Sequence, residues 1–308
     1  MPDSRYICGR VRTDCPEQFA ETLANLATNA LTAEVCITPK PGLVDCANSG
    51  AHHDMDIFTF MDSALALYPY FRKVTVTALS YTGAVSELLA VIQPLGIQAE
   101  TDMFTATHGV NTHKGAVFSL GVMCAAVGII ASRPDQYTNA YASLSELCVT
   151  ICRAKARTTA KLATKGQGVY QTYGLTGILG EAAAGYPNVF ELALPTLERY
   201  IAQGIPLQEA GVMTLLQLLT VVQDTNIVAR HDIATLHEVQ ARVKQDLQTC
   251  TTPQTFIHYA QTLDQQFIKR NISPGGCADL LALAIFVHRV FHAPTPPIPE
   301  KKQCHQLT

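Results

Sequence analysis

The chain has little charge. Asp, Glu, Lys and Arg make up 15% of its 308 residues, whereas roughly 25% is typical of soluble domains. Tryptophan is absent and aromatic residues reach only 7%, so a platform for stacking nucleic-acid bases is not expected. The net charge of -3 and the lack of long basic runs also disfavour nucleic acid as a partner. An anionic ligand must therefore be bound by a few placed cations in a pocket.

Cysteine spacing excludes two further classes of protein. The ten cysteines contain no Cys-x-x-Cys pair and lie scattered, mostly in apolar segments, which disfavours a disulfide framework and a structural zinc site. Cys148 and Cys152 are one helical turn apart and are predicted to be small core residues. There is no secretory apolar stretch at the N-terminus, and no uncharged run of about 20 apolar residues demands a bilayer. We expect a cytoplasmic protein without membrane contact.

What the chain has is a large apolar fraction, 48%, arranged mainly at three- and four-residue steps. Alternating β-branched runs, by contrast, are short and rare. Helices are predicted over 16–35, 54–68, 74–92, 143–161, 189–200, 206–224, 233–247, 253–268 and 273–290, with a further apolar segment from 115 to 130. Asp54 and Thr252 are the predicted N-caps of two of them. The pattern indicates one compact all-α catalytic domain over residues 16–292, between flexible ends at 1–15 and 293–308.

The first of five polar junctions between predicted helices spans Thr38 to Asp56. It contains Lys40, Asp45, His52, Asp54 and Asp56, in a segment too rich in Pro and Gly for a helix or a strand. A polar loop held between apolar helices is a common place for catalytic and binding residues. The alternative is an ordinary loop whose charges face water.

Two more junctions carry cations next to helix starts. At the second, free backbone amides together with Asn111, His113 and Lys114 could bind an anion, although a capped helix with an exposed lysine would have the same sequence. The third contains Lys165 and, further on, Glu181 between Gly180 and a run of alanines. Such small neighbours indicate close packing, and a half-buried glutamate needs a metal, a cation or a proton. A solvated glutamate on a helix surface is the alternative.

The last two junctions suggest a metal-bound polyphosphate. Asp224-Thr225-Asn226, expected at the end of an apolar helix, offers hard oxygen ligands suited to Mg²⁺, and Arg230 follows it. A plain C-terminal cap is the alternative there. Arg270 leads into Gly275 and Gly276, where backbone amides could approach an anion closely. The remaining histidines are expected to be surface or core residues; they are His237, His258, His288, His292 and His305.

The amino-acid sequences of these junctions resemble, in order, the motifs of the triphosphoribosyl-dephospho-coenzyme A synthases. The resemblance covers about residues 20 to 290. The six matching motifs are Thr-Pro-Lys-Pro-Gly-Leu-Val-Asp at 38–45, Gly-Ala-His-His-Asp-Met-Asp at 50–56, Gly-Val-Asn-Thr-His-Lys-Gly-Ala at 109–116, Gly-Glu-Ala at 180–182, Asp-Thr-Asn at 224–226 and Arg-Asn-Ile-Ser-Pro-Gly-Gly at 270–276. Six motifs in order are far more specific than any single one.

The resemblance implies a pentosyl transfer with ATP as co-substrate. The family joins the ribose C1 of ATP to the 2'-hydroxyl of 3'-dephospho-CoA and releases adenine. The product is the precursor of the prosthetic group on the acyl carrier protein of citrate lyase or malonate decarboxylase, and it passes to the enzyme that loads that carrier. The transition state is oxocarbenium-like, as in glycoside hydrolysis.

Roles for the candidate residues follow from that implied reaction. Glu181 or Asp54 would act as base or cation stabiliser, and a histidine such as His113 or a carboxylic acid would protonate the leaving adenine. Mg²⁺ would be held by Asp56, Asp224 and Asn226. The substrate-binding candidates are Lys40, Asp45, His52, Asn111, Lys114, Lys165, Arg230, Arg270, Gly275 and Gly276.

The chain departs from the family pattern at two places. Leu179 stands before Gly180-Glu181-Ala182 where the family commonly has Gly-x-Arg-Gly-Glu-Ala, and Arg230-His231-Asp232 replaces the family's Arg-Gly-Gly. Two glycines and one cation are thus missing near the expected phosphate contacts. Alternative hypotheses are an all-α, Mg²⁺-dependent hydrolase of nucleotides or ADP-ribosyl groups, and a non-catalytic nucleotide- or CoA-binding protein. The apolar fraction fits a homodimer as well as a monomer with a large core.

Overall fold

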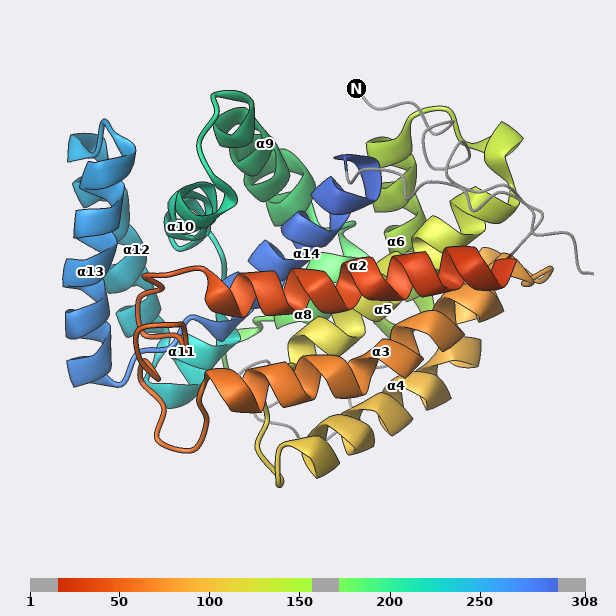
Figure 1. Ribbon diagram of the computed structural model, residues 1–308, viewed down its shortest axis with the longest axis horizontal. Helices are drawn as coiled ribbons and strands as arrows, with labels where there is room; N and C mark the ends of the chain where they lie inside the picture. Colours follow the sequence, from red (N-terminus) through yellow and green to blue (C-terminus); the bar gives the residue numbers. More distant parts are fainter. Residues whose placement is uncertain (1–15, 157–171, 293–308) are drawn as a thin grey trace, which may run out of the picture.

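The recurring apolar spacing of the sequence is realised as packed α-helices. The computed structural model describes residues 16–156 and 172–292, and this part contains no extended strand, so the all-α prediction is confirmed (Figure 1). The helices are α2 (Pro16–Cys36), α3 (Ile57–Leu79), α4 (Leu88–Ala106), α5 (Lys114–Ser132), α6 (Ala140–Ala156), α8 (Gly177–Ala183), α9 (Leu194–Ala202), α10 (Leu207–Leu218), α11 (Thr225–Arg230), α12 (Ile233–Asp246), α13 (Pro253–Arg270) and α14 (Gly275–His292). Short 3₁₀ turns precede α4 (Val85–Glu87), follow α5 (Pro134–Gln136) and follow α12 (Leu247–Thr249), and a π-helical turn, η4 (Asn188–Ala193), leads into α9.

Helices α5 and α14 form the centre of the fold. α5 packs against α3, α6 and α14, and nearly every residue from Ala116 to Ala131 is buried, as expected for a helix that is apolar all round. Both helices are long and apolar enough to cross a membrane, but 83% of an 18-residue stretch of α5 and 61% of the residues of α14 are buried inside the protein. Their apolar surfaces therefore build the core of this fold.

Helices α2, α3 and α4 lie side by side along one side of this core (Figure 1). The predicted boundaries of α3 are wrong at both ends. The helix begins at Ile57 with Asp56, not Asp54, as its N-cap, and it continues through Pro69 to Leu79. It continues because Phe71, Val74 and Ala78 extend its buried face. The helix predicted over 74–92 is consequently wrong, since the chain turns at Ser80 and α4 starts only at Leu88.

Other boundaries were predictable from local signals. α2 begins at Pro16 as expected and ends one residue beyond the predicted end. α13 begins at Pro253, and Thr252 forms a capping box with Thr255, which confirms the predicted cap. The loop before α3, helix α11 and the α13–α14 connection gather at one end of the molecule (Figure 1). Residues from distant parts of the sequence are thereby brought together.

Candidate active site

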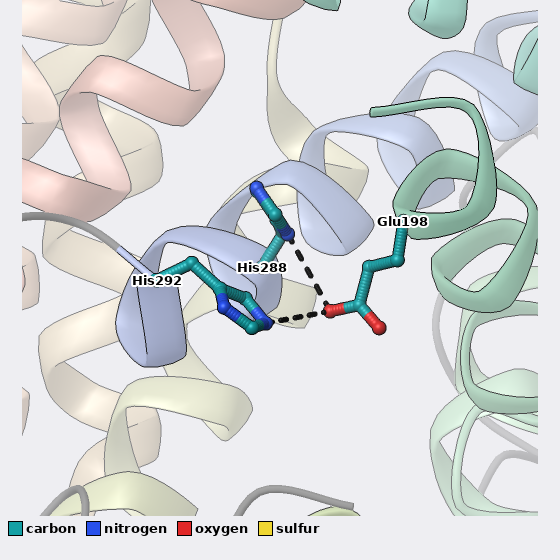
Figure 2. Close-up of side chains that lie close together, drawn as sticks. All are labelled: Glu198, His288 and His292. Atoms are coloured by element: carbon teal, nitrogen blue, oxygen red, sulfur yellow. Dashed lines mark hydrogen bonds and ion pairs between the residues drawn. The ribbon is translucent and has the colours of Figure 1, made fainter. Parts of the chain in front are cut away.

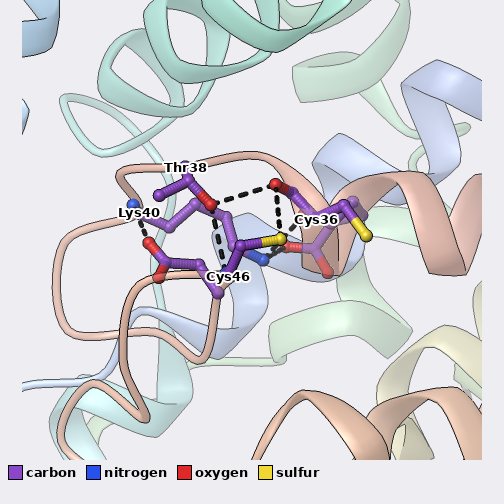
Figure 3. Close-up of polar contacts among 6 residues, drawn as sticks. Cys36, Thr38, Lys40 and Cys46 are labelled. Carbon is purple, nitrogen blue, oxygen red and sulfur yellow. Dashed lines mark hydrogen bonds and ion pairs between the residues drawn. The ribbon is translucent and has the colours of Figure 1, made fainter.

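Lys40 lies inside the loop between α2 and α3. Its Nζ is 2.5 Å from Glu34 Oε1 and donates to the backbone oxygen of Glu34 at 2.8 Å (Figure 3). Lys40 is 1% exposed and Glu34 4%. Burial raises the pKa of Glu34, and the ammonium of Lys40 opposes that rise. The sequence singled out Lys40 but not the buried glutamate that partners it.

Asp45 holds the same loop in shape. Its Oδ2 accepts the backbone N–H of Lys40 at 2.8 Å, and its Oδ1 accepts those of Ala47 and Asn48 at 2.7 and 3.1 Å. Figure 3 also shows Thr38, which donates to the backbone oxygen of Cys36 and accepts the N–H of Cys46. Both oxygens of this buried carboxylate are therefore used within the loop.

Asp264 of α13 fastens this loop to the rest of the protein. It accepts the backbone N–H of Gly42 at 2.9 Å and the side-chain N–H of Asn48 at 2.9 Å. Gly42 has φ +68 and lies against the backbone oxygen of Ile272, so no other residue fits there without displacing the chain. No motif in the sequence pointed to Asp264, because its partners lie more than 200 positions earlier in the chain.

Arg230 joins three of the five junctions. Its guanidinium donates to the backbone oxygen of Ala51 at 2.9 Å and to Asn271 Oδ1 at 2.8 Å, and it lies 3.2 Å from His52 Nδ1. Nε2 of His52 is 2.8 Å from Ser273 Oγ. Burial and the nearby guanidinium lower the pKa of His52 to about 4, so its ring is neutral at physiological pH. Arg230 and His52, both candidates for substrate binding, thus lie in contact at the edge of the junctions.

His113 is buried at the N-terminus of α5. Its Nδ1 is 2.7 Å from Ser63 Oγ, and the edge of its ring packs against Phe60. Burial, assisted by the charge of Lys40, lowers the pKa of His113 to about 3. Its Nε2 finds no hydrogen-bond partner among the described residues. A buried polar atom without a partner is uncommon in a folded protein and calls for an explanation.

Asp224 and the start of α14 are in contact. Asp224 was expected at the end of a helix, but it caps the start of α11, accepting the N–H groups of Asn226 and Ile227. Its Oδ2 also accepts the N–H of Cys277 at 2.9 Å. A Cβ at Gly276 would lie 3.0 Å from this carboxylate, and one at Gly275 would lie 2.9 Å from the Asn226 amide. The two glycines therefore allow α14 to approach Asp224 and Asn226 closely.

Asp279 extends this contact from α14 to α5. Its carboxylate accepts the backbone N–H of Ala116 in the first turn of α5, and it lies so close to Gly115 that a Cβ there would overlap it. Burial together with the negative charges of Glu34 and Asp224 raises its pKa well above the ordinary range. Asp279 lies three residues beyond the last of the six motifs, at 270–276, and its importance becomes visible only through this contact.

Glu181 is a further carboxylate near the start of α14. It lies on α8, and its Oε1 accepts a hydrogen bond from the amide of Asn188, the first residue of the π-helical turn. Its Oε2 is buried and has no partner among the described residues, and burial raises its pKa. Charges on Asp224, Asp279 and Glu181 all raise the pKa of the buried Cys277 thiol. The third, fourth and fifth junctions therefore surround one point, near the start of α14.

The remaining predicted site residues are exposed, cap a helix or pair with other side chains. Asp54 is exposed, 3.9 Å from His52 Nδ1, and Asp56 caps α3 by accepting the N–H of Thr59. Asn111 Oδ1 accepts the N–H of Lys114, whose Nζ is 2.9 Å from Glu100. Arg270 is bound through both of its terminal nitrogens by Glu238, at 2.7 Å each. Lys165 lies outside the described residues.

Comparison with known proteins shows which family this chain belongs to. Residues 20–295 match the CitG family, described as ATP:dephospho-CoA triphosphoribosyl transferase. The chain belongs to this family. It is 42% identical to a probable 2-(5''-triphosphoribosyl)-3'-dephosphocoenzyme-A synthase of Pectobacterium carotovorum over 83% of this chain and 84% of that protein. It is 40% identical to the synthase of Pectobacterium atrosepticum (87% of each chain) and 39% identical to a probable synthase of Vibrio cholerae (87% and 88%). No solved structure matches the chain.

Of the two departures from the family pattern, the one at His231-Asp232 has a structural role in this member. Asp232 caps α12 by accepting the N–H of Thr235 at 2.7 Å. Nε2 of His231 is 3.1 Å from the backbone oxygen of Asn271, beside the Arg230 contact. Leu179 lies on α8, two residues before Glu181, and is only partly buried. His231 and Asp232 thus connect the end of α11 to the start of α12 and the end of α13, and the carboxylates around Cys277 are retained.

Proposed function

We propose that this protein transfers the 5-triphosphoribosyl group of ATP to the 2'-hydroxyl of 3'-dephospho-CoA and releases adenine. The product, 2'-(5''-triphosphoribosyl)-3'-dephospho-CoA, would be the prosthetic-group precursor for the acyl carrier protein of citrate lyase or malonate decarboxylase. The observation that carries the proposal is the family match over residues 20–295. The convergence of the motif carboxylates near the start of α14 supports it.

The bond changes require one group that accepts the hydroxyl proton and one that stabilises the positive charge on the ribose. The bond between ribose C1 and the adenine nitrogen breaks, a bond from C1 to the 2'-oxygen forms, and the hydroxyl proton must leave that oxygen. A carboxyl group with a raised pKa can accept this proton near neutral pH. Glu181 has the raised pKa and a free oxygen, so it is assigned as the base. That oxygen is buried, and the side chain must turn to reach the substrate. Asp54, exposed at the loop, is the alternative.

His113 is assigned a positioning role and not an acid role. With a pKa of about 3 the imidazole is neutral at pH 7, so it cannot supply a proton to the leaving adenine. Its unpartnered Nε2 can form a hydrogen bond to a bound substrate. The proton for adenine must then come from another group.

The crowded carboxylates fit a divalent cation. The negative charges of Glu34 and Asp224 disfavour ionisation of Asp279, and a bound cation would relieve this repulsion. Mg²⁺ prefers such oxygen ligands and keeps water and phosphate oxygens as the others. Asp224 and Asp279, with the Asn226 amide, would hold it, whereas Asp56 is engaged as the cap of α3. When bound, Mg²⁺ would neutralise charge on the triphosphate.

The triphosphate itself would lie against the helix N-termini at this end of the molecule. Arg230 and Lys114 are the partly exposed cations there, and the amides at the starts of α5 and α14 favour negative charge. Lys40, Arg270 and Lys165 remain sequence-based candidates for this role; Lys40 pairs with Glu34 and Arg270 with Glu238, as Lys114 pairs with Glu100. The triphosphate is positioned and not hydrolysed, which fits a reaction that keeps it intact.

The decisive assay follows adenine release from ATP with and without dephospho-CoA. Glu181→Gln should lower adenine release by about 10²- to 10⁴-fold, the usual contribution of a general base, and leave ATP affinity within about tenfold. Glu191→Gln, at an exposed glutamate of the adjoining π-helical turn, is the matched control and should behave like the wild type. Wild-type turnover by Glu181→Gln would refute the assignment.

The same assay separates the competing functions. A hydrolase would consume nucleotide without dephospho-CoA, and a non-catalytic binding protein would bind ATP or dephospho-CoA and release no adenine. Adenine that appears only when dephospho-CoA is present supports the transferase. A cytoplasmic location, delivery of the product to the carrier-loading enzyme and a homodimer complete the proposal. The dimer is supported by exposed Phe58 and Leu65 on α3 and Ile97 on α4, and light scattering would test it.

A further inference from the structure

A second group of ligand-type side chains lies far from the proposed active site. Glu198 projects from α9, and His288 and His292 project toward it from the C-terminal half of α14 (Figure 2). Their ligand atoms all lie within 4.8 Å of one another, the one such group of three among the described His, Cys, Asp and Glu residues. His288 is nine residues beyond Asp279, about 13.5 Å along the helix axis at 1.5 Å per residue. The proposed function does not use these three side chains.

We propose that Glu198, His288 and His292 form a binding site for a transition-metal dication of the Zn²⁺ class, which links α9 to α14. The two histidines are four residues apart, so they lie on one face of the helix and can bind one ion together. Two imidazoles and one carboxylate are a ligand set that Zn²⁺ takes in proteins, with water at the fourth position. Mg²⁺ prefers oxygen ligands and is not expected there.

The distances are those of a nearly formed site. Glu198 Oε1 is 3.4 Å from His288 Nδ1 and 3.2 Å from His292 Nε2. With bonds of about 2.0–2.1 Å, two ligand atoms on a tetrahedral ion are about 3.3–3.4 Å apart. The two imidazole rings are stacked, with centroids 4.7 Å apart and an angle of 28° between their planes. Small side-chain rotations would therefore be enough to place all three atoms around one ion.

Neighbouring side chains orient the Glu198 carboxylate, and the three side chains remain accessible from solvent. The hydroxyl of Tyr141, on α6, donates to Glu198 Oε1 at 2.6 Å, and the Tyr141 ring packs edge-on against Phe291. Carboxylates that bind metal ions are commonly oriented by a hydrogen bond of this kind. Side-chain exposure is 17% for His288, 27% for Glu198 and 49% for His292. The ion can therefore enter from solvent and keep a water ligand.

The test is calorimetric titration of the purified full-length protein with Zn²⁺, followed by the visible absorption spectrum of the Co²⁺ form. We expect one saturable site and an intense tetrahedral Co²⁺ band. His288→Ala, His292→Ala and Glu198→Gln should each weaken Zn²⁺ binding at least tenfold and remove the band. His292 lies at the exposed end of α14, so its variant should fold even if the others do not; circular dichroism would confirm this.

Two matched variants report binding elsewhere. His258→Ala removes an exposed histidine of α13, and Cys46→Ser removes an exposed thiol; neither should change Zn²⁺ affinity by more than about twofold. The proposal is overturned if stoichiometric Zn²⁺ binding survives His292→Ala, if Cys46→Ser abolishes it, or if the wild-type dissociation constant is weaker than about 1 mM. Adenine release does not enter this test, so it stands or fails independently of the proposed function.

Discussion

At the scale of the residue, the most consequential feature is the buried pair of Lys40 and Glu34. Both side chains are nearly inaccessible, and the ammonium of Lys40 also lies close enough to His113 to lower the pKa of that imidazole. An ion pair of this kind is costly to break, because removal of one partner leaves a charge buried without compensation. Lys40 therefore has a structural task, whether or not its charge also acts on the triphosphate.

A double-mutant experiment separates the two tasks of Lys40. Lys40→Met should lower the free energy of unfolding by about 3–5 kcal/mol, the typical cost of leaving a buried partner unpaired. Lys40→Met combined with Glu34→Met should recover most of that loss, since two apolar side chains replace the pair. Urea unfolding measures both values, and Lys73→Met, at an exposed lysine of α3, is the control.

Activity of the same variants then distinguishes structure from substrate binding. If Lys40 contacts the triphosphate, the double variant is stable but keeps a raised KM for ATP. If Lys40 only neutralises Glu34, stability and KM recover together. A Lys40→Met protein as stable as the wild type would contradict the structural task altogether.

At the scale of the element, the approach of α14 to the start of α5 decides where the carboxylates lie. Asp279 accepts an amide of the first turn of α5, where negative charge is favoured. Gly115 makes this approach possible, since any side chain at that position would occupy the space of the Asp279 carboxylate. The motif glycine thus serves the packing of two helices, besides any contact with phosphate.

Gly115→Ala should consequently separate the two helices. We expect a loss of about 1–3 kcal/mol in the free energy of unfolding, as is usual for overpacking, and a fall in adenine release of at least tenfold as Asp279 is displaced. Gly96→Ala is the control: its Cβ would meet no atom closer than 3.5 Å, and alanine favours the helix by about 0.5–1 kcal/mol. Thermal unfolding and the adenine assay check both variants. Unchanged activity in Gly115→Ala would show that the position of Asp279 is not needed.

At the scale of the whole molecule, burial acts on four carboxylates that come from distant parts of the chain. The pKa values of Glu34, Glu181, Asp224 and Asp279 are all raised, with burial as the first cause in each case. A raised pKa means that the folded protein binds protons more tightly than the unfolded chain does. The contribution of these groups to the free energy of unfolding is therefore present at low pH, and it is lost as the pH rises through their raised pKa values.

Asp279→Asn removes one of these groups and so tests that dependence. In metal-free protein, we expect Asp279→Asn to unfold at a higher temperature than the wild type near pH 8, with the difference shrinking toward pH 5. Each pKa unit of the rise corresponds to about 1.4 kcal/mol, and asparagine keeps an oxygen that can accept the Ala116 N–H. Asp62→Asn, at an exposed site on α3, should show no such pH dependence. A constant difference across this range would refute the linkage.

Much of the fold was predictable, because the sequence signals that start a helix lie within a few residues of one another. The starts of α2 and α13 follow from Pro16 and from Thr252-Pro253, signals contained within a few residues. The predicted helix over 54–68 ended just before Pro69, whereas α3 continues through Pro69 because Phe71 and Val74 extend its buried face. The error at Asp224 was of the same kind, since the end of one helix and the cap of the next contain the same residue types.

The sequence by itself determined the all-α class, the polar junctions and the family, since periodicity, caps and ordered motifs are properties of short segments. Only the tertiary structure decided which charges face one another. Lys40 turned inward to Glu34, Arg270 bound Glu238, and Asp279 met the start of α5. Such pairings depend on how helices pack across the molecule and on the cost of burying a charge without a partner, and neither is written in any local pattern.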